Sequence, residues 1–418
     1  MVNYKFDFEN INVSLTSSIE KSLEEERKKI LDGRGDYKAL SLFNDLSVED
    51  NCRKVFDKIK SCRVVVLIGI GGSNLAPLSV AKAIGGEFYR DVLEREFFFL
   101  DTTDSTHSTR VKEKLKKYKE EGKEICYILI SKSGTTIESL ANFLFLFNNK
   151  KELDEISKNV VVITQRETPL WKEGEKRNYN LLEIDKDVGG RFSAFSSVGI
   201  LPLMLMGLSV ERFRKGAELA FNDVVDKKIN KSNPALNSTL AIFKNYNEER
   251  NILDTMYFSP NLDELGAWKR QLIAESLGKN GNGITPIVSI GSTDLHSMGQ
   301  LYLGGRDDKV HEIVDFKVKE NGFIGDGMEN INNLAGLSLS YLKDSLRKGI
   351  EGAYKNSKLP FYSIEFDTLN ETSIGYYMQM KLVEVVYLGK LLGINPFGQP
   401  NVEEYKKIAK ERIFGEIK

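Results

Sequence analysis

Short runs of β-branched and aromatic residues alternate with amphipathic segments of helical spacing along most of this chain. The first run, Arg63-Val-Val-Val-Leu-Ile68, leads directly into the glycine-rich turn Gly69-Ile-Gly-Gly-Ser73. Apolar runs bounded by glycines are typical of strands buried on both faces of a parallel sheet, so the alternation predicts a doubly wound α/β fold. Strands are expected at 63–68, 96–100, 125–130, 160–164 and 181–184, and in a second series at 253–258, 285–290, 310–316 and 360–365.

The length of the chain and the pattern of its charged and apolar residues predict more than one domain. Its 418 residues are enough for roughly two or three domains of ordinary size. Residues 1–60 are expected to form an N-terminal helical extension, because 20–60 is charged and helical in pattern. Residues 61–210 and 211–370 are then two α/β domains, and 371–418 is a C-terminal helical segment.

Composition excludes several classes of partner. With 59 basic and 60 acidic residues the net charge is −1, so no nucleic-acid partner is expected. Cys52, Cys62 and Cys126 lack metal-ligand spacing and indicate a reduced, intracellular compartment. The N-terminus lacks a secretory pattern, and no apolar run is long enough to cross a membrane. We therefore expect a cytoplasmic protein with no membrane partner.

The turn after the first predicted strand has the features of a small anion site. Gly71-Gly72-Ser73 is not a dinucleotide fingerprint, because Asn74 stands where a third glycine is required. No Gly-Lys-Ser/Thr follows either, which excludes a Walker loop. The turn fits one phosphate or a sugar hydroxyl near a helix start, or else a glycine turn that serves only packing.

A second loop, Ser131-Lys-Ser-Gly-Thr-Thr136, follows the predicted strand 125–130. Hydroxyls and the N–H groups of a helix N-terminus can bind a phosphate monoester without a metal. A single Ser/Thr run is usually just a helix cap. Two such loops at the ends of neighbouring strands, where α/β sheets bind ligands, favour a sugar phosphate.

Three charged or titratable residues are candidates for chemistry. Arg191 follows two glycines that allow its guanidinium to reach an anion in a cleft; the alternative is a surface ion pair. Glu275 lies at the edge of an apolar helical stripe, as a base facing a cavity would, or is an ordinary helix glutamate. His296 is a proton shuttle or a structural histidine. The three histidines lack metal-binding spacing, so no metal is expected.

A last motif lies near the C-terminus. Asn395-Pro-Phe-Gly-Gln399 marks a sharp turn, and Val-Glu403-Glu-Tyr-Lys406 continues it into a helix. The glutamine and the lysine either reach a site or cover the surface.

In this order, the motifs resemble the glucose-6-phosphate isomerase (phosphoglucose isomerase) family in its short bacterial-type form, over roughly residues 60–410. The resemblance implies two doubly wound sugar-isomerase (SIS) lobes with a helical C-terminal tail. It also implies a homodimer whose active site is shared between subunits, and no cofactor. The implied activity is the reversible isomerisation of glucose 6-phosphate and fructose 6-phosphate, in glycolysis and gluconeogenesis.

The resemblance further implies which residues bind the hexose phosphate. Two line the sugar, four hold the phosphate and one contacts the substrate elsewhere: Gly72 and Ser73; Ser131, Ser133, Thr136 and the backbone of Lys132; and Gln399. The last motif departs from the family, which usually has Asp or Asn before the glutamine and Gly before Val-Glu. Here Gly398 and Asn401 occupy those positions.

The catalytic roles implied by the resemblance fit the chemistry of the side chains. Glu275 is the base that carries a proton between C2 and C1 through a cis-enediol, and Arg191 stabilises the enediolate. His296, contributed by the neighbouring subunit, and Lys406 assist ring opening.

Three other functions are weighed against this one. A non-catalytic sugar-phosphate sensor would need neither Glu275 nor Arg191, and a glucosamine-6-phosphate synthase would carry an N-terminal cysteine nucleophile, where this chain has Met1-Val2. An isomerase that also accepts mannose phosphate is the third.

Overall fold

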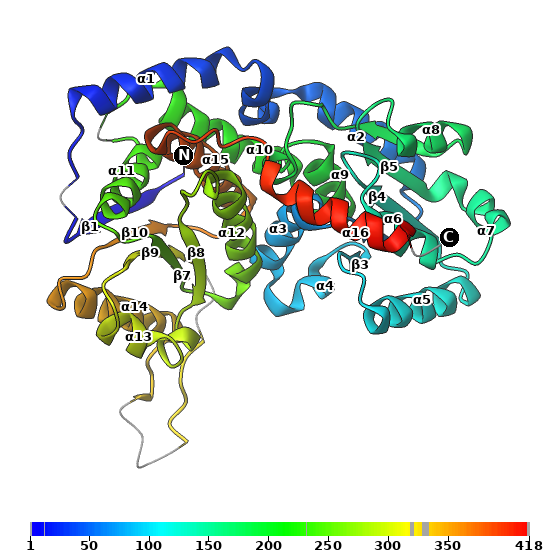
Figure 1. Ribbon diagram of the computed structural model, residues 1–418. Helices are drawn as coiled ribbons and strands as arrows, with labels where there is room; N and C mark the ends of the chain where they lie inside the picture. The colour runs from blue at the N-terminus through cyan, green and yellow to red at the C-terminus, as the bar shows by residue number, and fades with distance from the viewer. Residues whose placement is uncertain (1, 12, 231, 318–321, 328–333, 416–418) are drawn as a thin grey trace.

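The computed structural model of the protein describes residues 2–11, 13–230, 232–317, 322–327 and 334–415. Two five-stranded sheets form the centres of two lobes, which lie side by side in Figure 1. The sheet of the first lobe has the order β3-β2-β4-β5-β6, and all its neighbouring strands are parallel. Its strands are β2 (Val64–Ile68), β3 (Glu96–Leu100), β4 (Ile125–Ile130), β5 (Val160–Thr164) and β6 (Asn180–Glu183).

The sheet of the second lobe has the order β1-β10-β9-β7-β8. Its parallel strands are β7 (Ile252–Tyr257), β8 (Thr285–Ile290), β9 (Lys309–Phe316) and β10 (Phe361–Phe366). Every predicted strand in both lobes is confirmed, with its ends within one residue of the expected ones.

The fifth strand of the second sheet, β1 (Tyr4–Glu9), corrects part of the predicted N-terminal helical extension. It pairs antiparallel with β10 at the edge of the sheet. Tyr4, Phe6 and Phe8 are partly buried while the charged residues between them are exposed, which is the period of a strand with one buried face. Residues 1–60 therefore combine a strand with helices, and the predicted domain boundaries remain a prediction.

Helices separate the strands and complete the layers. The outer face of the first sheet packs on α5 (Ser105–Glu120), α6 (Ile137–Phe145), α7 (Lys150–Glu155) and α8 (Pro169–Lys176). The outer face of the second sheet packs on α13 (Gly299–Gly304) and α14 (Leu339–Asn356). The central core holds residues of α1 (Ser17–Asp32), α2 (Leu46–Ile59), α3 (Leu75–Gly85), α4 (Tyr89–Val92), α9 (Ser197–Met206), α10 (Val210–Phe221), α11 (Pro234–Asn247), α12 (Asp263–Leu277) and α15 (Glu371–Leu392).

The two lobes share this central core. Val65 and Leu67 of β2 point into it, whereas Val64, Val66 and Ile68 point into the outer core under α5–α8, as expected for a strand buried on both faces. The central core also takes in residues of the second sheet.

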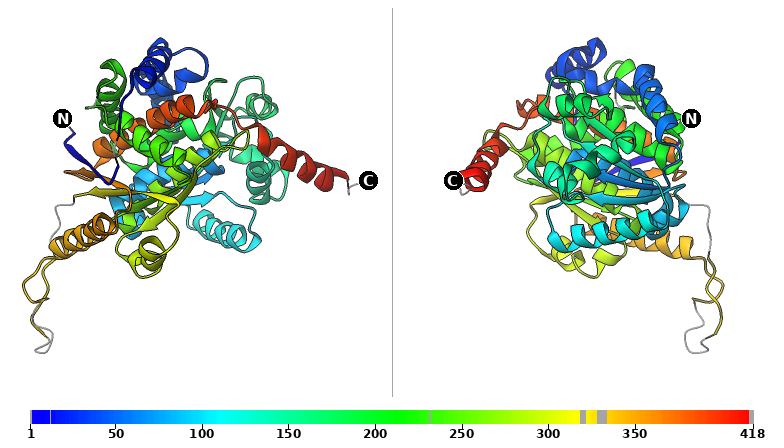
Figure 2. Two further views of the ribbon diagram at one scale, coloured as in Figure 1. Left: turned by 60° about the vertical axis from the view of Figure 1, so that its left-hand side comes forward. Right: turned by 90° about the vertical axis from the view of Figure 1, so that its right-hand side faces the viewer.

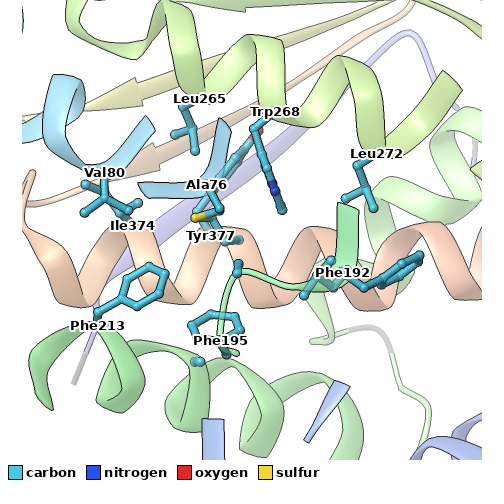
Figure 3. Packing of buried hydrophobic residues seen from close by; sticks show 14 of the residues in the cluster. Ala76, Val80, Phe192, Phe195, Phe213, Leu265, Trp268, Leu272, Ile374 and Tyr377 are labelled. Atoms are coloured by element: carbon cyan, nitrogen blue, oxygen red, sulfur yellow. The ribbon is translucent and has the colours of Figure 1, made fainter. Parts of the chain in front are cut away.

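Figure 3 shows how α12 joins the lobes. Trp268 and Leu265 of this second-lobe helix lie close to Ala76 of α3 and Tyr377 of α15, and all four are buried. Because the face of α12 that carries Leu265 and Trp268 is buried in the core, only the other faces of the helix are available for further contacts.

The predicted C-terminal helical segment consists of two helices with different surroundings. Apart from Thr372, the helix α15 is buried from Glu371 to Gly389, and it packs against α10 and α11, so it is part of the core. The helix α16 (Glu403–Gly415) contains no buried residue and extends away from the body in Figure 2. Among the described residues, no helix has both the length and the apolar character needed to span a membrane.

Candidate active site

The topology of the first sheet places the two predicted loops next to each other. The chain runs from β2 outward to β3 and then returns to β4 on the other side of β2. In parallel sheets, ligands bind outside the carboxyl ends of the strands at such a reversal. The turn Gly71–Ser73 follows β2, and the 131–136 loop follows β4, so both flank this point.

The 131–136 loop is held by its own hydroxyls. Ser131 is buried, and its Oγ lies 2.8 Å from Thr136 Oγ1 and accepts the N–H of Thr136 at 3.3 Å. Ser133 is exposed, and its Oγ accepts the N–H of Thr135 at 3.3 Å. Thr136 is the N-cap of α6 but its side chain makes no capping bond, so the first N–H groups of α6 are left for another acceptor.

Lys132 uses its side chain away from these hydroxyls. Its Nζ donates to the backbone carbonyl of Lys186 at 2.7 Å, and its own carbonyl accepts from the N–H of Gln165 at 3.2 Å. Burial lowers the pKa of Lys132. The lysine therefore connects the 131–136 loop to the segment that leads to Arg191.

Gly72 brings the first loop into direct contact with that segment. A Cβ placed on Gly72 would lie 2.3 Å from the carbonyl carbon and oxygen of Gly190 and 2.7 Å from the backbone nitrogen of Arg191. Any side chain at this position would push the two backbones apart. Ser73, which is half-buried, follows in the same turn and donates its N–H to Ile70 at 3.2 Å.

Arg191 is 3% exposed and is the centre of the site. Its Nε donates to Ser276 Oγ at 2.7 Å. Its Nη1 donates to Glu275 Oε2 at 3.3 Å and to Gln399 Oε1 at 3.1 Å. Burial lowers the pKa of Arg191 and the Glu275 carboxylate opposes this, but a guanidinium stays charged. The alternative of a surface ion pair does not fit a buried side chain.

Glu275 lies between Arg191 and a residue that the sequence analysis did not single out. Gln271, one turn earlier on α12, donates its Nε2 to Glu275 Oε1 at 3.0 Å. The carboxylate is 31% exposed, so one side of it is accessible. The i, i+4 spacing of the glutamine and the glutamate was the available signal for this pair. Gln271 also borders the first loop, because a Cβ on Gly71 would lie 2.8 Å from its Nε2.

Comparison with known proteins shows the family of the chain. The sequence profile of the family described as phosphoglucose isomerase matches residues 51–299. A probable glucose-6-phosphate isomerase of Methanococcus maripaludis is 33% identical over 99% of this chain and 95% of its own length. The glucose-6-phosphate isomerase of Methanocaldococcus jannaschii is 33% identical over 88% of each chain. The chain belongs to the phosphoglucose isomerase family.

Solved structures show the same fold. A hypothetical protein from Thermus thermophilus superposes with a TM-score of 0.86 over 98% of this chain and all of its own, at 26% identity. A glucose-6-phosphate isomerase from Chlamydia trachomatis superposes with a TM-score of 0.78 over 98% of this chain and 88% of its own, at 17% identity. The mixed α/β architecture with parallel sheets is therefore shared with a phosphoglucose isomerase.

Two residues to which the phosphoglucose isomerase resemblance assigns roles lie apart from this cluster. His296 is exposed in the turn that follows β8. Lys406 is on α16, where it pairs with Glu403 at 2.7 Å. Within the described part of the chain, no hydrogen bond or ion pair joins either side chain to Arg191, Glu275 or Gln399.

The described residues contain no group of three or more His, Cys, Asp or Glu side chains placed to hold a metal ion. Cys52, Cys62 and Cys126 are buried thiols without disulfide partners.

Proposed function

We propose that this member of the phosphoglucose isomerase family interconverts glucose 6-phosphate and fructose 6-phosphate through a base-mediated cis-enediol. The observation that carries the proposal is the Glu275 carboxylate, held between a buried guanidinium and the Gln271 amide with one side accessible. Relatives that are named glucose-6-phosphate isomerases and match nearly the whole chain support it. The reaction belongs to glycolysis and gluconeogenesis, and we place it in the cytoplasm without a cofactor.

In this mechanism Glu275 removes the C2 proton of the open-chain aldose, and the electron pair moves toward the C1 carbonyl oxygen. In the cis-enediol that forms, O1 gains a proton and O2 then loses one, which gives the C2 carbonyl of the ketose. The same carboxyl group returns its proton to C1, so a single base serves both directions. Arg191 presents a fixed positive charge to the enediolate, and burial strengthens that interaction because water does not screen it.

The phosphate group is assigned to the 131–136 loop. Ser131, Ser133 and Thr136 offer hydroxyls there, and the backbone of Lys132 and the start of α6 add N–H donors. Gly72 and Ser73 line the sugar. In this proposal the first lobe holds the phosphate, and α12 of the second lobe supplies the base.

Ring opening is assigned to His296 and Lys406, with His296 supplied by the second subunit of a homodimer. The exposure of His296, and its separation from the Glu275 cluster of its own chain, support this arrangement. In a twofold dimer each site would then combine Glu275 of one protomer with His296 of the other.

The proposed activity is tested with purified protein and fructose 6-phosphate in heavy water. We expect glucose 6-phosphate in a coupled assay, with solvent deuterium at C2. Activity should survive exhaustive dialysis against a chelator. Product without solvent deuterium, or activity that returns only with a divalent ion, would contradict the enediol route, and no product at all would contradict the activity.

The shared site is tested separately by mixing two inactive variants, Glu275→Gln and His296→Ala. Reassociated heterodimers would contain one intact site, so random mixing should restore about a quarter of wild-type activity. If both residues serve the same protomer's site, mixing restores none.

A further inference from the structure

A second buried cation, Lys279, lies next to the catalytic cluster and binds the same turn as Arg191. Its Nζ donates to the backbone carbonyls of Asn395 at 2.6 Å and Phe397 at 2.7 Å. The side chain is 8% exposed. Lys279 comes four residues after Glu275, directly behind the end of α12. It therefore ties the end of the helix that carries the base to the 395–398 turn.

Arg191 binds the two carbonyls of the 395–398 turn that Lys279 does not bind. Its Nη2 donates to the carbonyl oxygens of Pro396 at 2.5 Å and Gly398 at 3.0 Å. The carbonyls of residues 395, 396, 397 and 398 therefore point alternately at the lysine and the arginine. Since Gln399 follows at once and binds Nη1 of the same guanidinium, the shape of this turn contributes, together with Ser276 and Glu275, to the orientation of Arg191.

The backbone of Lys279 is fixed by a tight turn. Lys279 and Asn282 exchange both backbone hydrogen bonds, at 3.1 and 2.9 Å. Between them Asn280 and Gly281 have φ values of 56° and 75°, as a type I′ turn requires. The lysine is thus anchored at its backbone and at its ammonium group.

The 395–398 turn has room to move if this anchor is removed. A cavity of about 410 Å³ borders it and is lined by Tyr37, Asn395, Pro396 and Phe397 among others. The ring of Phe397 anchors the turn against Tyr37 and Phe192, whereas hydrogen bonds to the two cations hold its backbone carbonyls.

We propose that Lys279 is a positioning residue for the isomerisation, which keeps the 395–398 turn in the shape that directs Arg191 and Gln399 toward Glu275. The inference rests on the proposed function. Lys279 makes no contact with the 131–136 loop among the described residues, so its loss should affect the chemical step more than phosphate binding.

The charge of Lys279 supplies a second, independent readout. Burial and the neighbouring positive charge of Arg191 lower the pKa of Lys279 to about 8, while Asp36 and Glu275 oppose the shift. Above this pH the ammonium group becomes a neutral amine and binds the two carbonyls more weakly. The ratio of the wild-type kcat to the kcat of a variant with a neutral residue at position 279 should therefore decrease as pH rises.

The experiment compares wild type with Lys279→Met in the full-length chain. We expect kcat at pH 7 to fall by about 10- to 100-fold, because displacements near 1 Å at a catalytic group have effects of this size. KM and the affinity for a competitive sugar-phosphate inhibitor should be unchanged. The ratio of wild-type to variant kcat should decrease between pH 7 and pH 9.5, as the sign of the pKa shift requires.

Two further variants keep the test decisive. Lys112→Met is the matched control, because Lys112 is half-buried and also donates to a backbone carbonyl, that of Phe145 at 2.8 Å, on the remote helix α5. It should keep wild-type kcat. Lys279→Gln retains two N–H donors without the charge and should lose less kcat than the methionine variant.

An unchanged kcat in both Lys279 variants would overturn the proposal, as would a loss of inhibitor affinity equal to the loss of kcat or a ratio that does not vary with pH. These outcomes differ from failure of the proposed function, in which the wild type itself would not isomerise fructose 6-phosphate.

Discussion

The two sheets of this protein have related strand orders but differ in what they bury. In the first lobe the order β3-β2-β4-β5 has its counterpart in β8-β7-β9-β10 of the second, so each chain reversal falls beside the first strand of its series. The first-lobe strands β2 and β5 consist of aliphatic residues, apart from Thr164 at the end of β5. The second-lobe strands β7 and β9 bury Asp254, His311, Glu312 and Asp315.

These buried charges connect the second sheet to its helices. Glu312 of β9 contacts Lys269 of α12, lies 2.7 Å from Lys381 Nζ of α15 and accepts from the hydroxyl of Thr255 at 3.0 Å. Lys381 also contacts Glu384 at 2.5 Å, within α15. All the charged members of this group are buried.

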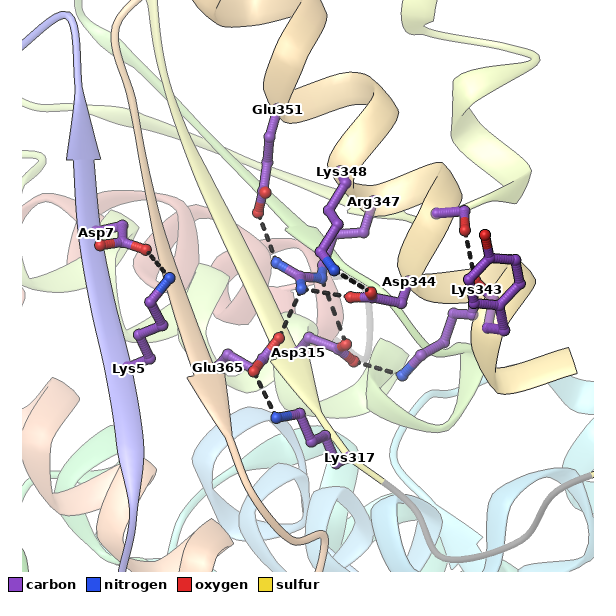
Figure 4. A network of polar contacts seen from close by, with 12 residues as sticks. Lys5, Asp7, Asp315, Lys317, Lys343, Asp344, Arg347, Lys348, Glu351 and Glu365 are labelled. Carbon is purple, nitrogen blue, oxygen red and sulfur yellow. Dashed lines mark hydrogen bonds and ion pairs between the residues drawn. The ribbon is translucent and has the colours of Figure 1, made fainter. Parts of the chain in front are cut away.

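A second group of charges joins β9 to the outer helix α14. Figure 4 shows Arg347 between Asp315, Glu365 and Glu351. Lys343 binds Asp315 at 2.6 Å. This group lies at the outer face of the sheet, away from α12.

This difference indicates that the two lobes contribute to the proposed site in different ways. The first lobe places small hydroxyl residues in loops at the ends of an apolar sheet, and these loops are the proposed phosphate site. The second lobe contributes a helix, α12, whose Lys269 pairs with the buried Glu312 of β9. We infer that the buried charges of the second lobe fix the direction of α12 and with it Glu275.

The largest expected effect is that of replacing Glu275, the proposed base, on the second-lobe helix α12. Glu275→Gln keeps the shape of the side chain but cannot accept the C2 proton. We expect kcat to fall by about 10² to 10⁴ or more, with loss of hydrogen exchange at C2 in heavy water. Binding of a sugar-phosphate inhibitor, measured by calorimetry, should be unchanged.

The control for this variant is Asp263→Asn, an exposed carboxylate at the start of the same helix. It should retain wild-type kcat. If Glu275→Gln still exchanges the C2 hydrogen at the wild-type rate, Glu275 is not the base.

The next prediction compares the stability lost with a buried ion pair of the second lobe and with an exposed ion pair of the first. Glu312→Gln removes the carboxylate shared by Lys269 and Lys381; Lys381 keeps Glu384, but Lys269 loses the carboxylate with which it pairs. Breaking a buried ion pair from one side costs about 3–5 kcal/mol, so the free energy of unfolding should fall by that amount. Denaturant titration measures it.

Glu183→Gln is the matched change on a strand of the first sheet. The Glu183 side chain is exposed and pairs with the exposed Arg166 at 2.6 Å, so the variant should lose less than about 1 kcal/mol. Equal losses in the two lobes would contradict the distinction drawn between their cores.

A smaller effect is expected at the ligand loop of the first lobe. Thr136→Ala removes one hydroxyl from the proposed phosphate site. A hydrogen bond to a charged group is worth about 1.5–3 kcal/mol, so substrate and inhibitor affinity should weaken about 10- to 100-fold. Thr136→Ser keeps the hydroxyl and should retain affinity. Unchanged inhibitor binding in the alanine variant would place the phosphate elsewhere.

Much of the fold could be predicted because strand signals are local. Most of the parallel strands, though not β6 or β8, are buried runs rich in β-branched and aromatic residues, and the ends of all of them were predicted within one residue. The strand β1 was missed, although Tyr4-Lys-Phe-Asp-Phe-Glu9 alternates as an edge strand should. Its partner β10 is far along the chain, and a short, half-charged run at a terminus has no local feature that predicts this pairing.

The site was predictable only where chemistry and motif coincide. Arg191, Glu275 and Gln399 were predicted as site residues and lie in one hydrogen-bonded cluster. Gln271 and Lys279 were not. A glutamine inside a helix and a lysine just behind its end are ordinary residues until Gln271 lies beside Gly71 and the 395–398 turn is folded against Lys279. That contact depends on segments more than a hundred residues apart.

The smallest effect is expected at Asp185, a partly exposed carboxylate of the first lobe, which contrasts with the buried carboxylates of the second lobe. Asp185 contacts Lys38 and accepts the N–H of Asp187 at 2.9 Å, and both charged side chains are partly exposed. Partial burial raises the pKa of Asp185, but the hydrogen bonds from Lys38 and Asp187 lower it more, so the pKa lies below its usual value. The stabilisation is therefore present above the pKa of the unfolded chain and is lost as pH falls through the lowered value.

Asp185→Asn should reduce the free energy of unfolding by about 0.2–1 kcal/mol at pH 7, because solvent screens such a pair. The difference between wild type and variant should shrink below about pH 4, where the Asp185 carboxylate of the unfolded chain begins to bind a proton. Denaturant titrations at pH 7 and pH 3, with Lys38→Met and the double variant completing a mutant cycle, measure the pairwise part. A coupling energy of 3 kcal/mol or more would mean that this exposed pair behaves like the buried network around Glu312, and the contrast between the lobes would no longer hold.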